Sequence, residues 1–264
     1  MPSSRAPPSR SGLRPRGSRL PCAYRPAVVT TRLDGDVRIV QLDRPERRNA
    51  VNSETAELLL DAFLAFEAAP DEKVAILTGD ATAFCAGADL KDLPRLRPTG
   101  PLGPTRLQLS KPVLAAIEGW CVAGGLELAV WCDLRVAGRS AQLGCLERRW
   151  GVPLIDGGTQ RLPRIVGLGR ALDLILTGRA IGADEAFAMG LVNRVVDDGD
   201  ALRTATELAH QIASSPWTCV VSDRACVYEG LGRTLVDGLA LEDAHGREVI
   251  FSPDFQAGVD RFNA

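Results

Sequence analysis

One segment, in which a strand-like run gives way to glycines and then to a helix, constrains this chain more than any other. Residues 112–118 (PVLAAIE) predict a buried strand, and a helix is predicted from Gly124. The first amide groups of a helix lack partners within it and carry partial positive charge, so they suit a developing oxyanion. Glu127 follows three residues later, on the same face of the first turn. The segment therefore predicts a carbonyl-binding N–H beside a carboxylate, although glycines at a helix start also serve tight packing.

A second apolar run, residues 73–79 (KVAILTG), leads into another segment of small residues, 84–90 (FCAGADL). Four further motifs occur in order around these two: residues 44–50 (RPERRNA), 157–162 (GGTQRL), 176–179 (LTGR) and 186–192 (AFAMGLV). In this order the motifs resemble those of the enoyl-CoA hydratase/isomerase (crotonase) family. The resemblance covers residues 28–262, which is nearly the whole chain apart from its N-terminal arm.

The resemblance implies an α/β fold. It places a crotonase-like spiral of repeated β-β-α units over residues 27–197 and a C-terminal helical trimerisation region of the same domain over 198–264. Periodicity alone predicts one α/β domain, with a hairpin over 28–43 and a helix over 52–69. No uninterrupted apolar run reaches the roughly 18 residues that a membrane-spanning helix needs, so no association with a membrane is predicted.

Residues 1–26 differ in composition from the rest of the chain, with six arginines, six prolines and no acidic residue. Such a segment cannot bury enough apolar surface to fold, so a disordered basic arm is predicted. Its composition is typical of organelle transit peptides, yet its prolines oppose the amphipathic helix that those peptides form. We therefore expect a cytoplasmic protein rather than one of the mitochondrial matrix.

Composition and missing motifs exclude several classes of function. Without the arm, 25 basic and 33 acidic residues remain, and such an acidic body does not attract nucleic acid. The seven cysteines form no CxxC pair, and His210 and His245 lie far from Cys85 and Cys121 in sequence. Neither a metal site nor a Cys–His nucleophile is predicted. The chain also lacks GxGxxG and GxxxxGK[ST] motifs, so no cofactor is expected beyond the coenzyme A of the substrate.

The family resemblance assigns roles to residues in the two small-residue segments. The amide groups of Ala88 and Gly124 match the oxyanion hole that holds the thioester oxygen of an acyl-CoA. Glu127 matches the first of two catalytic carboxylates, and Glu147, twenty residues further on, matches the second. Two carboxylates that face one water can divide the roles of base and acid when their environments set their protonation apart.

Charged neighbours leave the role of Glu147 open. Arg148 and Arg149 follow it where the family usually carries apolar residues, so a surface ion pair is an alternative to a proton donor. Asp156 stands where the family usually has a small residue, and it is a third candidate for proton transfer.

The resemblance also implies where coenzyme A binds. It is expected along Ala88-Asp89-Leu90-Lys91 and the 44–49 loop, mostly through backbone contacts, with Gly124 completing the substrate site. Arg47, Arg48 or Lys91 could reach its phosphates, although each is also consistent with a solvated surface charge.

These observations favour a 2-enoyl-CoA hydratase that adds water across the α,β-double bond of an acyl-CoA thioester. One alternative is a Δ3-Δ2 enoyl-CoA isomerase in which Glu127 acts alone. Another is a non-catalytic acyl-CoA-binding or assembly protein. The resemblance further implies a homotrimer or a dimer of trimers.

Overall fold

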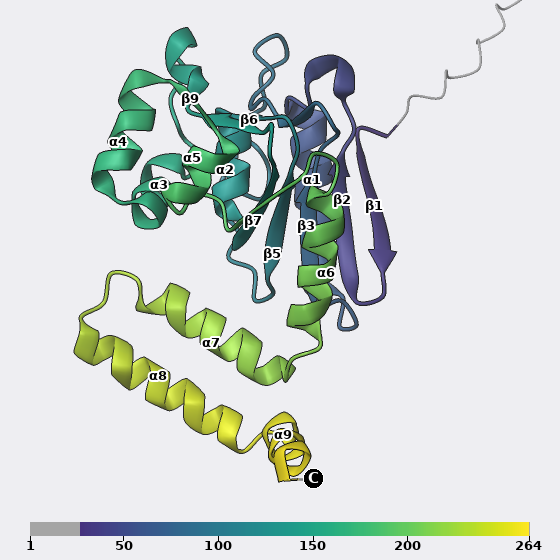
Figure 1. Cartoon of the computed structure of the whole chain (residues 1–264), viewed down its shortest axis with the longest axis vertical. Coiled ribbons are helices and arrows are strands. Elements are labelled where there is room, and N and C mark those ends of the chain that lie inside the picture. Colours follow the sequence, from purple (N-terminus) through teal and green to yellow (C-terminus); the bar gives the residue numbers. More distant parts are fainter. Residues whose placement is uncertain (1–26, 264) are drawn as a thin grey trace, which may run out of the picture.

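Two β-sheets of unequal size form the centre of the protein (Figure 1). The structure is a computed structural model that describes residues 27–263, so the prediction of a disordered arm over 1–26 lies outside the described residues. Within this range the larger sheet has the order β1 (Val29–Asp34), β2 (Val37–Leu42), β3 (Val74–Thr78), β5 (Val113–Ile117), β7 (Leu134–Gly138) and β10 (Arg194–Val196). The smaller sheet has the order β4 (Ala83–Cys85), β6 (Trp120–Val122), β8 (Gln142–Gly144) and β9 (Ala180–Gly182).

The chain alternates between the two sheets. It passes from β3 to β4, then from β5 to β6, and then from β7 to β8, leaving one strand in the large sheet and the next in the small sheet each time. Neighbouring strands of β3, β5 and β7 are parallel, as are those of β4, β6 and β8. This topology confirms the spiral α/β fold expected from the family resemblance.

The elements predicted from periodicity are present. The β1–β2 hairpin is antiparallel, with Val29 opposite Leu42 and Asp34 opposite Val37. The helix α1 (Ser53–Ala68) begins after Asn52, whose side chain accepts a hydrogen bond from the Thr55 amide at 2.9 Å. Asparagine is among the preferred residues for satisfying a free amide at a helix start, which explains why the helix begins here.

Helices cover both faces of the large sheet, which is why its central strands are almost wholly apolar. All five residues of β3 and all five of β5 are buried. The helix α1 packs with one core cluster, and α6 (Ala201–Ala213) packs with a second cluster through small residues such as Ala205 and Ala209. The helix α6 therefore lies against the sheet, although the sequence assigned it to the C-terminal region.

Between β8 and α6 the chain is mainly helical. It forms the 3-10 turn η2 (Leu146–Trp150), then α3 (Gly158–Val166), α4 (Leu168–Thr177) and α5 (Ala183–Ala188). These helices group at one side of the molecule, opposite α1 (Figure 1).

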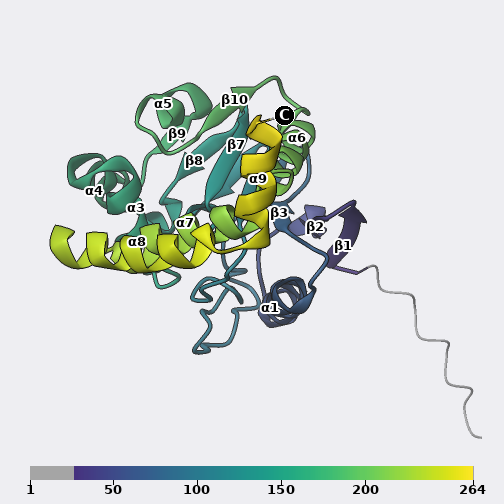
Figure 2. The ribbon, with the colours of Figure 1, turned by 90° about the horizontal axis from the view of Figure 1, so that it is seen from below.

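The last three helices stand apart from the sheets. The helices α7 (Trp217–Gly230) and α8 (Leu235–Ile250) form a hairpin, and α9 (Pro253–Asn263) crosses its end (Figure 2). None of the three has a buried side chain. The domain boundary at residue 197 stays a prediction. No helix within the described residues is long and apolar enough to cross a membrane.

The segment between β4 and β5 is a loop, as its prolines and glycines predict. Its middle, however, is not solvated, because residues 100–105 are all buried. The side chain of Leu102 is 1% exposed and joins the main core cluster. This loop therefore forms an inner wall of the protein next to the start of α2 (Gly124–Trp131).

Candidate active site

Glu127 lies on α2, a helix whose eight residues are all buried and which carries no other charged side chain. Its Oε1 atom accepts hydrogen bonds from the backbone amides of Asp156 at 2.9 Å and Gly158 at 2.8 Å. Its Oε2 atom accepts none from the described residues, and it is not among their fully buried, unpartnered atoms. One oxygen is therefore fixed at the start of α3, while the other is available to a ligand.

Burial is the largest influence on Glu127 and raises its pKa to about 7. The amides of Gly158 and Asp156 oppose this rise, and the negative charges of Asp156 and Glu147 add to it. The three carboxyl groups therefore act on one another. A carboxyl group whose pKa is near neutrality can both accept and release a proton under physiological conditions.

The backbone amide of Ala88 donates no hydrogen bond within the described residues, although neighbouring amides and carbonyls are hydrogen-bonded. Ala88 forms an isolated parallel bridge with Val51. In that bridge the Val51 amide donates to Gly87 at 2.8 Å, and the Asp89 amide donates to Val51 at 2.8 Å. Both hydrogen bonds of the bridge thus involve the residues that flank Ala88. Within residues 27–263 no group accepts a hydrogen bond from the Ala88 N–H.

The amide of Gly124 is the first of α2, and it also lacks an acceptor in the described part of the chain. The preceding residue, Ala123, has φ 55° and ψ −129°, a conformation that side chains disfavour and that tends to occur at functional sites. The Ala123 amide donates to Gly144 at 2.8 Å, which anchors the helix start to β8. A Cβ built on Gly124 would lie 3.5 Å from the Ala88 nitrogen, so the two free amides adjoin.

Gly87 keeps the Gly124 amide accessible. Its φ of +93° is one that side-chain-bearing residues rarely adopt. A Cβ at this position would lie 2.7 Å from the Gly124 nitrogen and 3.0 Å from the Ala123 side chain. The glycine of the FCAGADL segment is therefore required for the approach of one loop to the other.

Glu147 is buried on η2, and neither of its carboxyl oxygens has a hydrogen-bond partner in residues 27–263. Burial raises its pKa, and the charge of Arg148 opposes this rise as a lesser influence. The surface ion pair that the sequence left open does not form, because the Arg148 Nε donates to the Ile175 carbonyl at 3.2 Å instead. A buried carboxyl group without partners favours its protonated form, which makes it a candidate proton donor.

Asp156, the third candidate acid, is buried and directed towards the loop that precedes β5. Its Oδ1 atom accepts hydrogen bonds from the Leu102 amide at 3.1 Å and from the Thr105 hydroxyl. Burial raises the pKa of Asp156, while these two bonds oppose the rise. The carboxyl group is therefore engaged by the protein itself.

The segment predicted to bind coenzyme A has an inner and an outer part. Asp89 is buried and forms an ion pair with Arg44 at 3.1 Å, while its Oδ1 accepts a hydrogen bond from the Lys91 amide at 3.0 Å. Leu90, Lys91 and Arg48 are exposed. The Asp89 carboxylate thus holds the segment in place, whereas the other three side chains face outward.

The two cysteines near the site are poor candidates for nucleophiles. Cys85 and Cys121 are fully buried, and burial raises the pKa of Cys85 to about 12 and that of Cys121 well above its usual value. The Cys85 Sγ accepts a hydrogen bond from the Gly87 amide at 3.3 Å. Both thiols are therefore held in their neutral form.

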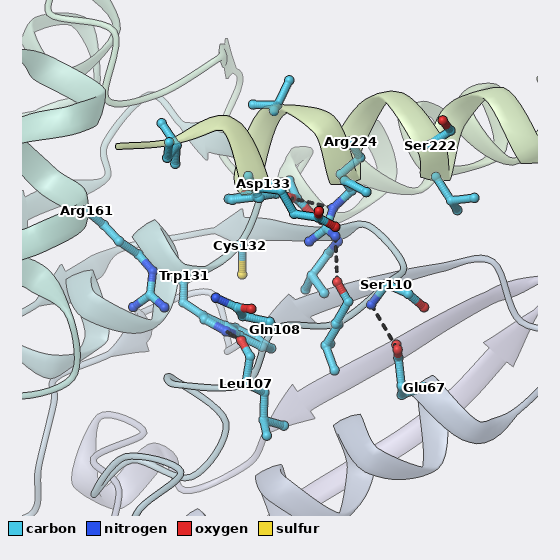
Figure 3. A pocket seen from close by; sticks show the side chains of 18 of the residues that line it. Glu67, Leu107, Gln108, Ser110, Trp131, Cys132, Asp133, Arg161, Ser222 and Arg224 are labelled. Atoms are coloured by element: carbon cyan, nitrogen blue, oxygen red, sulfur yellow. Dashed lines mark hydrogen bonds and ion pairs between the residues drawn. The ribbon is translucent and has the colours of Figure 1, made fainter. Parts of the chain in front are cut away.

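A cavity of about 1270 Å³ lies between the sheet core and the α7–α8 hairpin (Figure 3). Trp131, Cys132 and Arg161 line it from the core, and Ser222 and Arg224 line it from α7. Neither Glu127 nor Glu147 lines this cavity. It lies beside the hydrogen bonds by which Arg224 and Tyr228 of α7 hold Asp133, and it is distinct from the site around the glutamates.

Sequence reasoning missed the groups that hold the site together. It noted GGTQRL but assigned no role to the Gly158 amide, and it did not anticipate that Leu102 and Thr105 reach Asp156. The role of the Gly158 amide could have been inferred from the two glycines, because they mark a helix start and a helix start offers free amides. The contacts of the loop with Asp156 span 51 and 54 residues and have no local signal.

Fold and site together define an α/β protein that can polarise a carbonyl group and move protons beside it. The family model described as enoyl-CoA hydratase/isomerase matches residues 33–263. An enoyl-CoA hydratase of Mycobacterium tuberculosis is 36% identical over 240 residues, which are 86% of this chain and 90% of that protein. The crotonyl-CoA hydratase of Syntrophomonas wolfei is 37% identical over 219 residues, or 79% and 84% of the two chains.

Solved structures agree with these sequence relationships. The crystal structure of an enoyl-CoA hydratase from Mycobacterium tuberculosis matches with a TM-score of 0.86 at 33% identity, and it covers 89% of this chain and 95% of that chain. The chain therefore belongs to the enoyl-CoA hydratase/isomerase family.

Proposed function

We propose that this protein is a 2-enoyl-CoA hydratase, an enzyme that adds water across the α,β-double bond of an acyl-CoA thioester. The observation that carries the proposal is the pair of adjoining, unpaired amides of Ala88 and Gly124 beside the buried Glu127. The hydratases among the relatives, at about 35% identity over most of the chain, support the same reaction.

In the proposed mechanism the thioester oxygen accepts hydrogen bonds from the Ala88 and Gly124 amides. These bonds strengthen as negative charge develops on that oxygen, so they withdraw electrons from the double bond and make C3 electrophilic. The amides are fixed by the Val51 bridge and by the start of α2, and they need no reorganisation during the reaction. Removal of one such donor typically costs roughly 10²–10³ in rate.

The two glutamates divide the proton transfers. Glu127 acts as the base, since two backbone amides stabilise its carboxylate form. It takes a proton from water while the water oxygen bonds to C3. Glu147 acts as the acid, because burial without partners favours its protonated form. Its proton goes to C2, the double bond becomes single, and one water molecule has been added. Exchange with solvent then restores both glutamates.

Coenzyme A is placed by the 88–91 segment, whose Arg44–Asp89 ion pair fixes the backbone. The exposed side chains of Arg48 and Lys91 supply positive charge for its phosphates. The proposed route uses no metal ion and no redox cofactor. Asp156 stays an alternative source of a proton.

The proposal is tested with purified protein and crotonyl-CoA, followed by the absorbance of the enoyl thioester. We expect the absorbance to fall and 3-hydroxybutyryl-CoA to form. The Glu127→Gln variant should lose this activity by roughly 10²–10⁴-fold, which is the usual contribution of a general acid or base. Binding of the thioester without turnover would point instead to a non-catalytic acyl-CoA-binding protein.

A second candidate is the Δ3-Δ2 enoyl-CoA isomerase, in which Glu127 moves a proton alone. Both carboxyl oxygens of Glu147 are buried, which favours this candidate, since an acid that the substrate cannot reach would not transfer a proton. The Glu147→Gln variant separates the two functions. Loss of hydration indicates a hydratase, whereas retained conversion of a 3-enoyl-CoA without hydration in either protein indicates an isomerase.

We further propose a homotrimer, or a dimer of trimers, in the cytoplasm. The C-terminal helices support assembly, because their exposed apolar side chains include Val227, Leu231, Leu235, Val236, Leu239, Phe251 and Phe262. Extensive exposed apolar surface often marks an interface. The location is supported by the six described cysteines, all of which are free. Light scattering should give three or six times the mass of one chain, and a monomer would contradict the assembly.

A further inference from the structure

Asp156 connects two parts of the site that are far apart in sequence. Its carboxylate Oδ1 accepts hydrogen bonds from the Leu102 amide and the Thr105 hydroxyl, both in the 99–107 loop. Its own backbone amide donates to the Glu127 Oε1 at 2.9 Å. One residue thus touches both the loop and the carboxyl group that we propose as the base.

The local structure is built around these contacts. Thr105 is fully buried and Asp156 is 3% exposed. Gly100 has φ +103°, and a Cβ on it would lie 2.0 Å from the Thr105 Oγ1 and 2.7 Å from the Asp156 Oδ1. Only glycine leaves room for the hydroxyl and the carboxylate to meet there.

Arg161 also joins the same two residues. The Arg161 guanidinium donates to the Thr105 carbonyl at 2.7 Å and to the Asp156 carbonyl at 3.1 Å. The loop is also held at its end, where the Trp131 indole N–H donates to the Leu107 carbonyl at 3.0 Å (Figure 3). The loop is therefore fastened by hydrogen bonds along its length and is not merely packed.

The loop places the Leu102 side chain against Gly124. A Cβ on Gly124 would lie 2.6 Å from the Leu102 Cδ1, so this side chain covers the start of α2. Leu102 is itself buried, so an apolar side chain lies beside the residue that supplies one of the two proposed donors. Apolar surroundings strengthen the interaction of a fixed donor with a developing negative charge.

We propose that Asp156 is a positioning residue whose carboxylate holds the 99–107 loop over the site while its amide orients Glu127, so that the loop and the base form one coupled arrangement. The inference rests on the proposed hydratase function. The positioning role does not require Asp156 to transfer a proton. Loss of the Thr105 hydroxyl should therefore impair catalysis even though the Thr105 side chain is fully buried.

The test compares wild type with Thr105→Val, Thr105→Ser and Asp156→Asn. We expect Thr105→Val to lower kcat for crotonyl-CoA hydration by roughly 10-fold to 100-fold, as for a slightly misplaced catalytic group, with KM nearly unchanged. Thr105→Ser restores the hydroxyl and should retain kcat. Asp156→Asn keeps an acceptor oxygen and should retain most of it. Amide hydrogen exchange at Leu102 should be faster in Thr105→Val than in Thr105→Ser.

Two results would overturn the proposal. One is Thr105→Val with the kcat and exchange rates of wild type. The other is Asp156→Asn without turnover while Thr105→Val is unaffected, which would make Asp156 a proton donor. If wild type itself fails to hydrate crotonyl-CoA, the hydratase assignment fails separately. The exchange rates then decide alone: faster exchange in Thr105→Val supports the fastened loop, and unchanged exchange overturns it.

Discussion

Gly87 and Gly124 meet so closely that a Cβ on the first would lie 2.7 Å from the amide nitrogen of the second. This contact joins the loop after β4 to the first turn of α2, and it brings the Ala88 and Gly124 amides together. The positive φ of Gly87 adds to the constraint, because a side chain there would be strained in any case.

Substitution Gly87→Ala should therefore damage the oxyanion hole. We expect kcat for crotonyl-CoA to fall by roughly 10²–10³-fold, the usual cost of losing one donor, with a smaller effect on binding. Gly169→Ala is the matched control, since no atom lies within 4 Å of the added Cβ. Steady-state kinetics of both variants check this prediction, and an active Gly87→Ala enzyme would argue against the proposed donors.

The raised pKa of Glu127 predicts a pH-dependent stability. Because this pKa is higher in the folded protein, about 7, than the ordinary 4.5, the folded state holds the proton more tightly. Stability should therefore be greatest below pH 4.5, decrease as the pH rises from 4.5 to about 7, and level off above that. Glu127→Gln should be more stable than wild type at pH 8 by roughly 1–3 kcal/mol, and the difference should vanish below pH 4.5.

Urea unfolding at several pH values measures this difference. Glu46→Gln, which changes an exposed residue, provides the control and should leave the pH dependence as it is in wild type. An equal stability of wild type and Glu127→Gln at pH 8 would show that Glu127 carries no burial penalty.

The opposite protonation states of the two glutamates predict a bell-shaped pH profile of kcat/KM. One limb should lie near pH 7, at the pKa of Glu127, and the other limb should report the raised pKa of Glu147. Because the Arg148 charge lowers the pKa of Glu147, Arg148→Gln should move the Glu147 limb to higher pH. Two limbs that both stay in place would mean that Glu147 takes no part in the proton transfers.

The buried Arg44–Asp89 ion pair predicts a large cost in stability when it is broken. Both side chains are buried, so removal of either leaves an uncompensated charge inside the protein. Arg44→Ala and Asp89→Ala should each lower the free energy of unfolding by roughly 3–5 kcal/mol, and the double variant should cost less than their sum. Arg203→Ala, in an exposed ion pair on α6, should change the urea midpoint little. Additive effects of the buried pair would contradict a direct interaction.

The parts of the fold with strong local signals could be predicted from the sequence. The β1–β2 hairpin follows from alternating apolar residues around a short turn, and α1 follows from its Asn52 cap and apolar spacing. The small sheet could not be derived from periodicity, because its strands have only three residues each. Strands of that length show no recognisable alternation.

In the site, too, features that are local in sequence could be predicted, whereas contacts between distant residues could not. The helix start at Gly124 and the position of Glu127 one turn later are local, and the chain places them as the spacing predicts. The buried state of Glu147 was not evident, because Arg148 and Arg149 suggested a surface. The contacts of Asp89 with Arg44 and of Asp156 with Thr105 join residues 45 and 51 positions apart, and only the folded chain reveals them.

A crystal structure with a bound acyl-CoA would show whether the Ala88 and Gly124 amides form the oxyanion hole. We expect the thioester oxygen to lie about 2.7–3.1 Å from both the Ala88 and the Gly124 nitrogen, with the Glu127 Oε2 facing C3. A thioester oxygen bound elsewhere, with these two amides still unpaired, would contradict it.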